Sequence, residues 1–151
     1  MIRIEEEAWR AILAHARSVY PEECCGALLG LRQEGLSRVL RALPLENAHP
    51  GPRRSRYQVR PEELLEAERQ ARREGVKLVG IYHSHPDCPA YFSRTDLENA
   101  CPWYCFLVVS ICQGRFAGAG AWTVHPDQAA AAAEELLLPE VPPEAPARQA
   151  S

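Results

Sequence analysis

Hydrophobic and polar positions alternate along the first third of the chain in a pattern that predicts strands around one helix. Residues 1–4 and the short apolar runs 25–31 and 36–45 have the length and composition of strands. Residues 5–20 carry apolar side chains at helical spacing, so one face of this helix packs on a core. That face consists of Ala8, Trp9, Ile12, Leu13, Ala16 and Val19. Pro21 ends the helix.

The middle of the chain predicts a loop and further elements of the same sheet. Residues 46–56 hold two prolines, a glycine and three arginines, a composition typical of a loop. A helix follows from Pro61 to Gly75, with Leu64, Ala67 and Ala71 on its inward face. The remaining predicted elements are a strand over 76–85, a short helix over 93–100 that begins at Ser93, and strands over 104–111 and 116–124 joined by a tight turn at Gln113 and Gly114.

Composition changes after Asp127, which divides the chain in two. Residues 1–126 are predicted to form one α/β domain around a single mixed sheet, and 127–151 an extension. In that extension, residues 128–138 (QAAAAAEELLL) favour a helix, whereas 139–151 are rich in Pro, Ala and Glu and are typical of a disordered tail.

Charge and cysteine content exclude several classes of protein. The net charge of -3 gives no basic stripe, so no nucleic-acid partner is expected. The apolar runs fall far short of the roughly 20 residues that span a membrane, and the N-terminus lacks the pattern of a signal peptide. We therefore expect a cytoplasmic protein whose six cysteines are reduced and mostly buried. The sequence leaves a homodimer open.

Two histidines near the end of a predicted strand are the first candidates for chemistry. Alternate residues of a strand share a face, so Lys77, Val79, Ile81, His83 and His85 are expected on one side. The two histidines are then about 6.6 Å apart at Cα, which allows both imidazoles to reach one ion.

A carboxylate downstream completes a set of three metal ligands. Asp96 lies on the first turn of the predicted helix after the strand, and Ser93 lies three residues earlier. Two histidines and a carboxylate leave the fourth zinc position to water, which needs a base. Glu22 and Glu23 are both candidates for that base. The simpler interpretation is an ordinary strand end, with Ser93 as a helix cap and Asp96 as a first-turn charge.

These residues together resemble the JAMM (MPN+) zinc metalloprotease family. Its signature is an upstream glutamate, then HxH, seven residues and SxxD. Here His83-Ser84-His85 and Ser93-Arg94-Thr95-Asp96 match with complete spacing, and Pro21-Glu22-Glu23-Cys24-Cys25-Gly26 fits the upstream element with Glu23 in the glutamate position. The resemblance covers residues 1–124 and is strongest to small stand-alone bacterial members.

The resemblance implies a fold, a cofactor and a reaction. The fold is the MPN (cytidine-deaminase-like) fold, a curved mixed sheet flanked by helices. One catalytic zinc ion is held by His83, His85 and Asp96, with Glu23 as general base and acid and Ser93 as oxyanion donor. The substrate is a ubiquitin-like sulfur-carrier protein, cut after its C-terminal Gly-Gly.

Two residues and two alternative functions complete the expectations. Many members have proline where this chain has Phe92, so Phe92 is expected in the loop wall, and Cys88 is either a packed thiol or a thiolate that occupies the open zinc position. A metal-free MPN scaffold that only binds partners is one alternative. A deaminase-like hydrolase is the other, but its H-x-E and P-C-x-x-C patterns are absent from the sequence.

Overall fold

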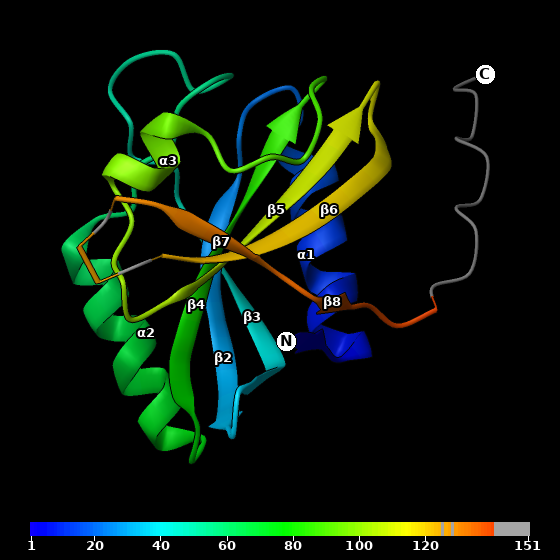
Figure 1. The fold of residues 1–151 in the computed structure, drawn as a ribbon. Coiled ribbons are helices and arrows are strands. Elements are labelled where there is room, and N and C mark those ends of the chain that lie inside the picture. The colour runs from blue at the N-terminus through cyan, green and yellow to red at the C-terminus, as the bar shows by residue number, and fades with distance from the viewer. Residues whose placement is uncertain (125, 128, 141–151) are drawn as a thin grey trace.

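The computed structural model describes residues 1–124, 126–127 and 129–140, which form one curved sheet with three helices (Figure 1). The strands are β1 (Ile2–Ile4), β2 (Cys25–Gln33), β3 (Leu36–Leu45), β4 (Lys77–Pro86), β5 (Cys105–Cys112), β6 (Arg115–Val124), β7 (Ala131–Glu134) and β8 (Leu136–Leu137). The helices are α1 (Glu6–Val19), α2 (Pro61–Arg73) and α3 (Arg94–Glu98).

The sheet is mixed, as predicted, and its strand order is β7-β6-β5-β4-β2-β3-β1-β8. β2 pairs with β3 and with β4 in antiparallel orientation, while β4 and β5 are parallel and are joined by the connection that contains α3. The predicted hairpin between β5 and β6 turns at Gln113 and Gly114, both at positive φ (51° and 79°). β4 therefore lies at the centre of the sheet, with the HxH pair at its C-terminal end.

The helix predicted over residues 128–138 is wrong in the part that the structure describes, because Ala131–Glu134 and Leu136–Leu137 form strands. β7 pairs antiparallel with β6, and β8 pairs parallel with β1. These partners lie at opposite ends of the strand order, so one short segment covers both edges and makes the sheet nearly barrel-like. The alanines favour a helix when isolated, but pairing with two exposed edges outweighs that preference. The tail predicted over 139–151 lies, beyond residue 140, outside the described residues.

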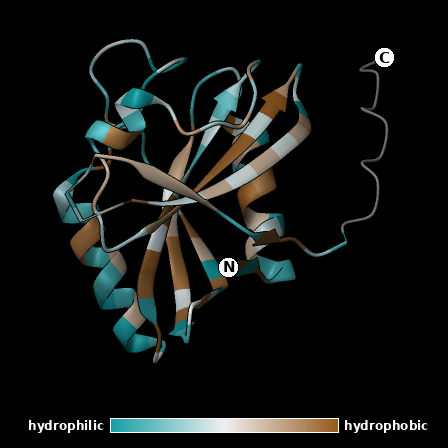
Figure 2. Ribbon diagram, in the orientation of Figure 1, coloured by the Kyte–Doolittle hydropathy of each residue, from teal (hydrophilic) through white to brown (hydrophobic). Residues whose placement is uncertain are grey.

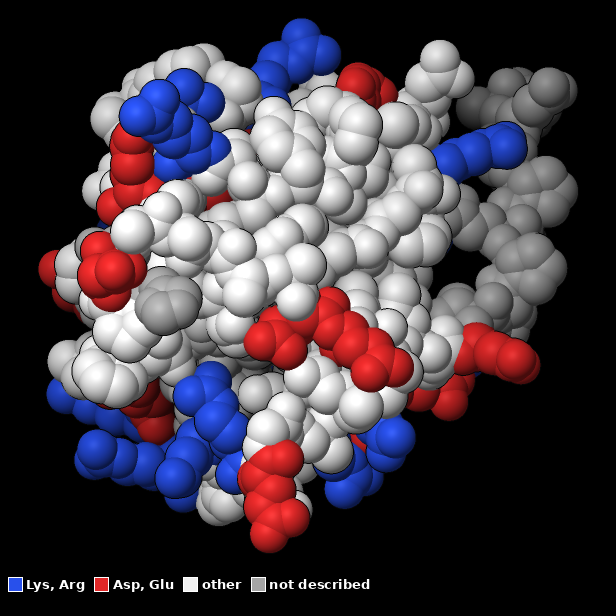
Figure 3. Space-filling view, in the orientation of Figure 1, with Lys and Arg blue, Asp and Glu red and all other residues white. Residues whose placement is uncertain are grey.

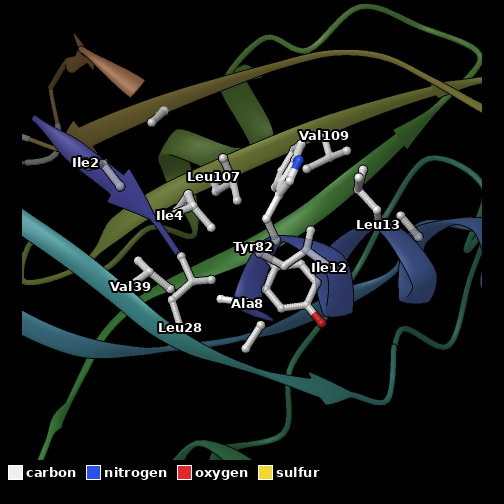
Figure 4. Close-up of a cluster of buried hydrophobic side chains, with 14 of the residues drawn as sticks. Ile2, Ile4, Ala8, Ile12, Leu13, Leu28, Val39, Tyr82, Leu107 and Val109 are labelled. Carbon is white, nitrogen blue, oxygen red and sulfur yellow. The ribbon is translucent and has the colours of Figure 1, made fainter. Parts of the chain in front are cut away.

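One face of the sheet packs on α1 and forms the larger core (Figure 4). The predicted inward residues Ala8, Trp9 and Ile12 are buried there against Tyr82 of β4. Figure 2 shows hydrophobic residues along the central strands and on the side of α1 that faces them. A Cβ on Gly26 would lie 2.2 Å from the Tyr82 ring, so a glycine is required where this ring crosses the neighbouring strand.

The opposite face packs on α2 and α3 and carries the histidines. Ile81 and Phe106 form its core with the partly buried Leu64 of α2. Val79 does not share this face, contrary to prediction, because it packs in the α1 cluster with Tyr82. The register between β2 and β4 shifts at this point, with Gly80 opposite Leu28 and Leu78 opposite Leu29. A β-bulge of this kind changes the face on which following side chains lie.

The structure also bears on the predicted state of the cysteines and on the prediction that nothing spans a membrane. All six cysteines are free. Cys24, Cys25 and Cys105 are buried like small apolar side chains, whereas Cys88, Cys101 and Cys112 are partly exposed, so burial holds for half of them. Among the described helices, none is long and apolar enough to cross a membrane.

Candidate metal centre

The two histidines are placed by the central strand and converge on one point. His83 lies opposite Cys25 in the β2–β4 register, and both imidazoles are buried. Their Nε2 atoms are 3.2 Å apart. Two ring nitrogens this close to each other converge on one point, an arrangement that a shared cation would stabilise.

Asp96 approaches the same point from the start of α3. Its Oδ2 lies 3.3 Å from His83 Nε2 and 3.7 Å from His85 Nε2. A reciprocal capping box holds it there, since Asp96 N donates to Ser93 Oγ (3.0 Å) and Ser93 N donates to Asp96 Oδ2 (2.9 Å). Burial alone raises the pKa of Asp96, but hydrogen bonds with His83 and His85 outweigh it and hold the pKa well below its usual range.

The outer sides of the imidazoles are fixed by neighbouring groups. His85 Nδ1 lies 3.0 Å from the Pro89 carbonyl, and only a protonated Nδ1 can donate to it. Burial lowers the pKa of His85, but Asp96, the Pro89 carbonyl and Glu23 outweigh it and raise the pKa of this imidazole in the metal-free protein. When the ring is neutral, the contact with Pro89 leaves the lone pair on Nε2, the usual arrangement for a metal-binding histidine. The His83 ring stacks on Tyr57, with ring centroids 4.4 Å apart. Burial lowers the pKa of His83, so this imidazole is neutral at neutral pH and able to bind a metal.

Glu23 reaches the centre from the segment that precedes β2. Continuing the antiparallel register from Cys25 and His83 places Glu23 opposite His85, and its Oε1 lies 4.0 Å from His85 Nε2. Burial raises the pKa of this carboxyl to about 7. Glu22, the other candidate, does not line the cavity that Glu23 shares with His85 and Asp96. The structure therefore favours Glu23.

Asn47 and Ser84 support Glu23, although the sequence pattern indicated neither. The buried Asn47 amide donates to the carbonyls of Glu23 (3.1 Å) and Arg56 (2.9 Å). The Ser84 hydroxyl accepts from Cys24 N at 2.8 Å. A buried amide needs fixed partners, and those of Asn47 come from distant segments, so only the fold reveals its role.

The centre opens into a cavity of about 950 Å³. Tyr57 and Tyr91 flank the imidazoles, and the Tyr91 ring meets the edge of His85 with centroids 4.9 Å apart. Arg54 and Arg56, from the loop between β3 and α2, and Arg94 of α3 line the same cavity. A cavity of this size with a few converging polar groups is typical of a substrate-binding site.

Phe92 and Cys88 differ in their relation to this cavity. Phe92 is not part of its lining, contrary to prediction. Its ring instead packs on Phe106 (5.4 Å) and stacks on Trp122 (5.7 Å), so it anchors the α3 loop to the sheet. Cys88 does line the cavity, and its carbonyl accepts a hydrogen bond from Ser110. Burial raises the pKa of the Cys88 thiol, which disfavours a thiolate at neutral pH in the absence of a metal.

The distances within the centre fit a bound metal ion. Ligands about 2.0–2.1 Å from a tetrahedral ion lie about 3.3 Å from one another. The three distances among His83, His85 and Asp96 are 3.2, 3.3 and 3.7 Å. Ligand atoms of Glu23, His83 and His85 also lie within 4.8 Å of one another. Asp96 lies nearer to both imidazoles than Glu23 lies to His85, and both carboxylates are close enough to the imidazoles to contribute to such a site.

A curved mixed sheet with this centre at the end of its central strand has the architecture of a JAB/MPN domain. A family model described as prokaryotic homologs of the JAB domain matches residues 5–125. The chain therefore belongs to this family of prokaryotic JAB-domain proteins.

Curated relatives carry names of proteolytic enzymes. The chain is 40% identical over 87 residues to the probable TtuB-protein conjugate cleaving protease of Thermus thermophilus, a match covering 58% of this chain and 55% of the relative. It is 38% identical over 97 residues to the CysO-cysteine peptidase of Mycobacterium tuberculosis, covering 64% of each. It is 35% identical over 114 residues to the desampylase of Haloferax volcanii, covering 72% and 80%. The chain thus spans about half to two thirds of the length of the first two.

Solved structures agree with the fold. A protein of Desulfitobacterium hafniense, solved in solution, has a TM-score of 0.80 at 30% identity, covering 93% of this chain and 94% of that one. A JAB1/MPN domain protein of Archaeoglobus fulgidus has a TM-score of 0.55 at 17% identity, covering 93% and 100%, and supports the fold alone.

Proposed function

We propose that this chain is a zinc-dependent peptidase or isopeptidase that hydrolyses the bond after the C-terminal Gly-Gly of a ubiquitin-like sulfur-carrier protein. The observation that carries the proposal is the convergence of His83, His85 and Asp96 on one point, with Glu23 beside it in a cavity. The names of the relatives, which refer to TtuB conjugates, CysO-cysteine and desampylation, support the substrate class.

His83, His85 and Asp96 are the proposed zinc ligands. The lone pairs of two imidazole Nε2 atoms and one carboxylate oxygen are the donors that a catalytic zinc site uses. When bound, zinc supplies Lewis-acid activation of a water molecule and of the scissile carbonyl. Three protein ligands would leave one coordination position of the ion for water or substrate.

Glu23 is the proposed proton carrier. Hydrolysis breaks the amide C–N bond, joins the water oxygen to the carbonyl carbon and moves one proton to the leaving amine. A carboxyl with a pKa raised to about 7 takes up and releases that proton near neutral pH. Its place opposite His85 puts it next to the reacting atoms rather than among the ligands.

Ser93 is the proposed donor to the developing oxyanion. Its Oγ accepts a hydrogen bond from Asp96 N, which fixes the oxygen and leaves the hydroxyl proton to be donated. The side chain lines the cavity beside the metal ligands. A donor held in place before the reaction stabilises the transition state without reorganisation.

The biological setting follows from the same resemblance. Cleavage of an amino acid from a carrier belongs to sulfur transfer or cysteine biosynthesis, with the cytoplasm as the expected location. Six free cysteines are in keeping with a reducing compartment. A homodimer remains a prediction.

A metal-free MPN scaffold is the alternative function. A scaffold needs no metal ligands, whereas this chain keeps Glu23, His83, His85 and Asp96 in one cluster. Zinc content separates the two: a purified protein that neither contains zinc nor gains thermal stability on its addition is a scaffold.

The direct test uses sulfur-carrier proteins from the same genome. Each carrier is prepared with a C-terminal extension after Gly-Gly and incubated with the zinc-loaded chain, and the products are read by mass spectrometry. We expect a single cut after the second glycine. Intact carriers at every enzyme concentration, with zinc bound, would contradict the proposed reaction.

A further inference from the structure

The cavity at the metal centre has more positive than negative side chains. Its arginines are Arg54, Arg56 and Arg94, and its carboxylates are Glu23 and Asp96. Asp96 contacts both imidazoles and Glu23 faces His85, so the metal centre already uses both carboxylates. Figure 3 shows positive side chains over α3 and along the adjoining edge of the molecule. An anionic group on the substrate would complement this wall.

Arg56 is the cavity arginine whose charge acts on Glu23, where it opposes the rise of the pKa caused by burial. Arg94 pairs with Glu98 (Nε–Oε1 3.6 Å), and the charge of Arg54 acts on Asp87, whose pKa it helps to lower. Arg56 donates only to the Ser55 carbonyl and forms no ion pair with the described part of the chain. Its guanidinium fork is therefore available to a carboxylate, the group it fits best.

The backbone of Arg56 is held beside the proposed proton carrier. Asn47 donates to the carbonyls of both Arg56 and Glu23, which fixes the two residues next to each other. The following residue, Tyr57, is stacked on the ring of His83. Arg56 therefore lies between two fixed contacts, the hydrogen bond from Asn47 and the stacked rings of Tyr57 and His83, and it lines the same cavity as Glu23. In the proposed reaction, Glu23 delivers a proton to the leaving nitrogen in this cavity.

We propose, on the basis of the proposed function, that Arg56 binds the free α-carboxylate of a single amino acid joined to the carrier's C-terminal glycine. In such a substrate the carboxylate is one carbon away from the leaving nitrogen, so it lies close to Glu23. In an isopeptide the leaving nitrogen belongs to a lysine side chain and has no carboxylate nearby. The site accordingly prefers one-residue extensions, releasing a free amino acid and the carrier carboxylate.

The test compares two substrates that differ only in this charge. A Gly-Gly sulfur carrier from the same genome is extended by one alanine, made either as the free acid or as the amide. We expect wild-type kcat/KM to be about tenfold or more higher for the acid. Arg56→Gln should lose that preference by slowing the acid alone, and Arg56→Lys should keep part of it.

Arg60 provides the matched control in the same loop. It is paired with Glu46 (2.9 Å) and lies outside the cavity lining, so Arg60→Gln should keep the wild-type preference. A second readout avoids turnover: in the Glu23→Gln background, the acid should bind more tightly than the amide by calorimetry, and Arg56→Gln should remove the difference.

The outcomes separate this inference from the proposed function. Equal cleavage of acid and amide by the wild-type chain overturns the role of Arg56 and leaves the peptidase intact. An equal loss on both substrates in Arg56→Gln assigns the residue to contact with the folded carrier and also overturns it. Cleavage of neither substrate by the zinc-loaded wild type overturns both.

Discussion

The Ser84 hydroxyl, which lies between the two proposed histidine ligands in sequence, accepts a hydrogen bond of 2.8 Å from the backbone N–H of Cys24. Ser84 N in turn donates to the Cys24 carbonyl at 3.1 Å. Cys24 directly follows Glu23, so these two bonds couple the strand that carries the ligands to the segment that carries the proton carrier. The serine of HxH is therefore a positioning residue in this chain.

Replacing Ser84 by alanine should disturb Glu23 more than the metal. The change leaves the buried Cys24 N–H without its partner, which costs about 1–3 kcal/mol of unfolding free energy. We expect zinc content to stay at the wild-type level while kcat falls. Urea unfolding, metal analysis and carrier cleavage measure the three quantities. Ser110→Ala, which removes another buried hydroxyl bonded to the Cys88 loop, is the control for stability loss alone.

Glu23→Gln should separate catalysis from metal binding. The amide keeps the size of the side chain but cannot carry the proton, so we expect a loss of about 10²–10⁴ in kcat with zinc retained. Cleavage of an extended carrier and metal analysis on the same preparation check this. Activity near the wild-type level would remove Glu23 from its proposed role, and loss of zinc would make it a ligand.

Asp96→Ala should lose the metal because it removes the carboxylate nearest to both imidazoles. The same change also breaks the capping box of α3, so a control is needed. Ser93→Ala breaks the other half of the box, the hydrogen bond from Asp96 N, and leaves the Asp96 carboxylate in the chain. We expect Ser93→Ala to keep zinc while losing about 10²–10³ in rate. Equal metal loss in both variants would assign the effect to the helix cap.

The metal-free protein should lose stability as pH rises, on account of Glu23. Its folded pKa of about 7 lies above the ordinary value of 4.5, so between these values the folded state binds more protons than the unfolded chain. The stabilising contribution of the protonated carboxyl is complete below about pH 4.5 and is lost as pH passes about 7. Urea unfolding of chelator-treated protein measures this trend, and Glu23→Gln should flatten it. An identical slope in both proteins would exclude Glu23 as its source.

The local pattern of apolar and polar residues was enough to predict most of the sheet and the candidate metal-binding residues on it. The apolar runs became β2 to β6, and Ser93 caps α3 in the way its position before Asp96 indicated. His83 and His85 share a face because no irregularity interrupts the strand between them. These features depend on neighbours in sequence, and such preferences are consistent with the final fold.

Each wrong prediction concerns residues whose structure depends on partners that are distant in the sequence. Residues 131–134 and 136–137 pair with the sheet edges instead of forming a helix, and Val79 changes face because of a bulge against β2. The role of Asn47 depends on three separate segments meeting at one amide, and Phe92 packs on aromatic residues of β5 and β6. Nothing in the residues next to these positions carries that information.

The segment that forms β7 and β8 has a consequence for solubility. It supplies a hydrogen-bonding partner to β6 and to β1, the strands that would otherwise end the sheet. A chain cut after residue 126 would lose both partners together and present two rows of unpaired N–H and C=O groups. Such rows recruit strands from other molecules, so the shortened chain should form larger assemblies than the full chain at the same concentration. Light scattering coupled to size-exclusion chromatography would show the difference, and a monomeric shortened chain would contradict it. The segment that forms β7 and β8, which the sequence predicts to be an extension of the domain, should therefore keep strands of neighbouring copies from pairing with β1 and β6.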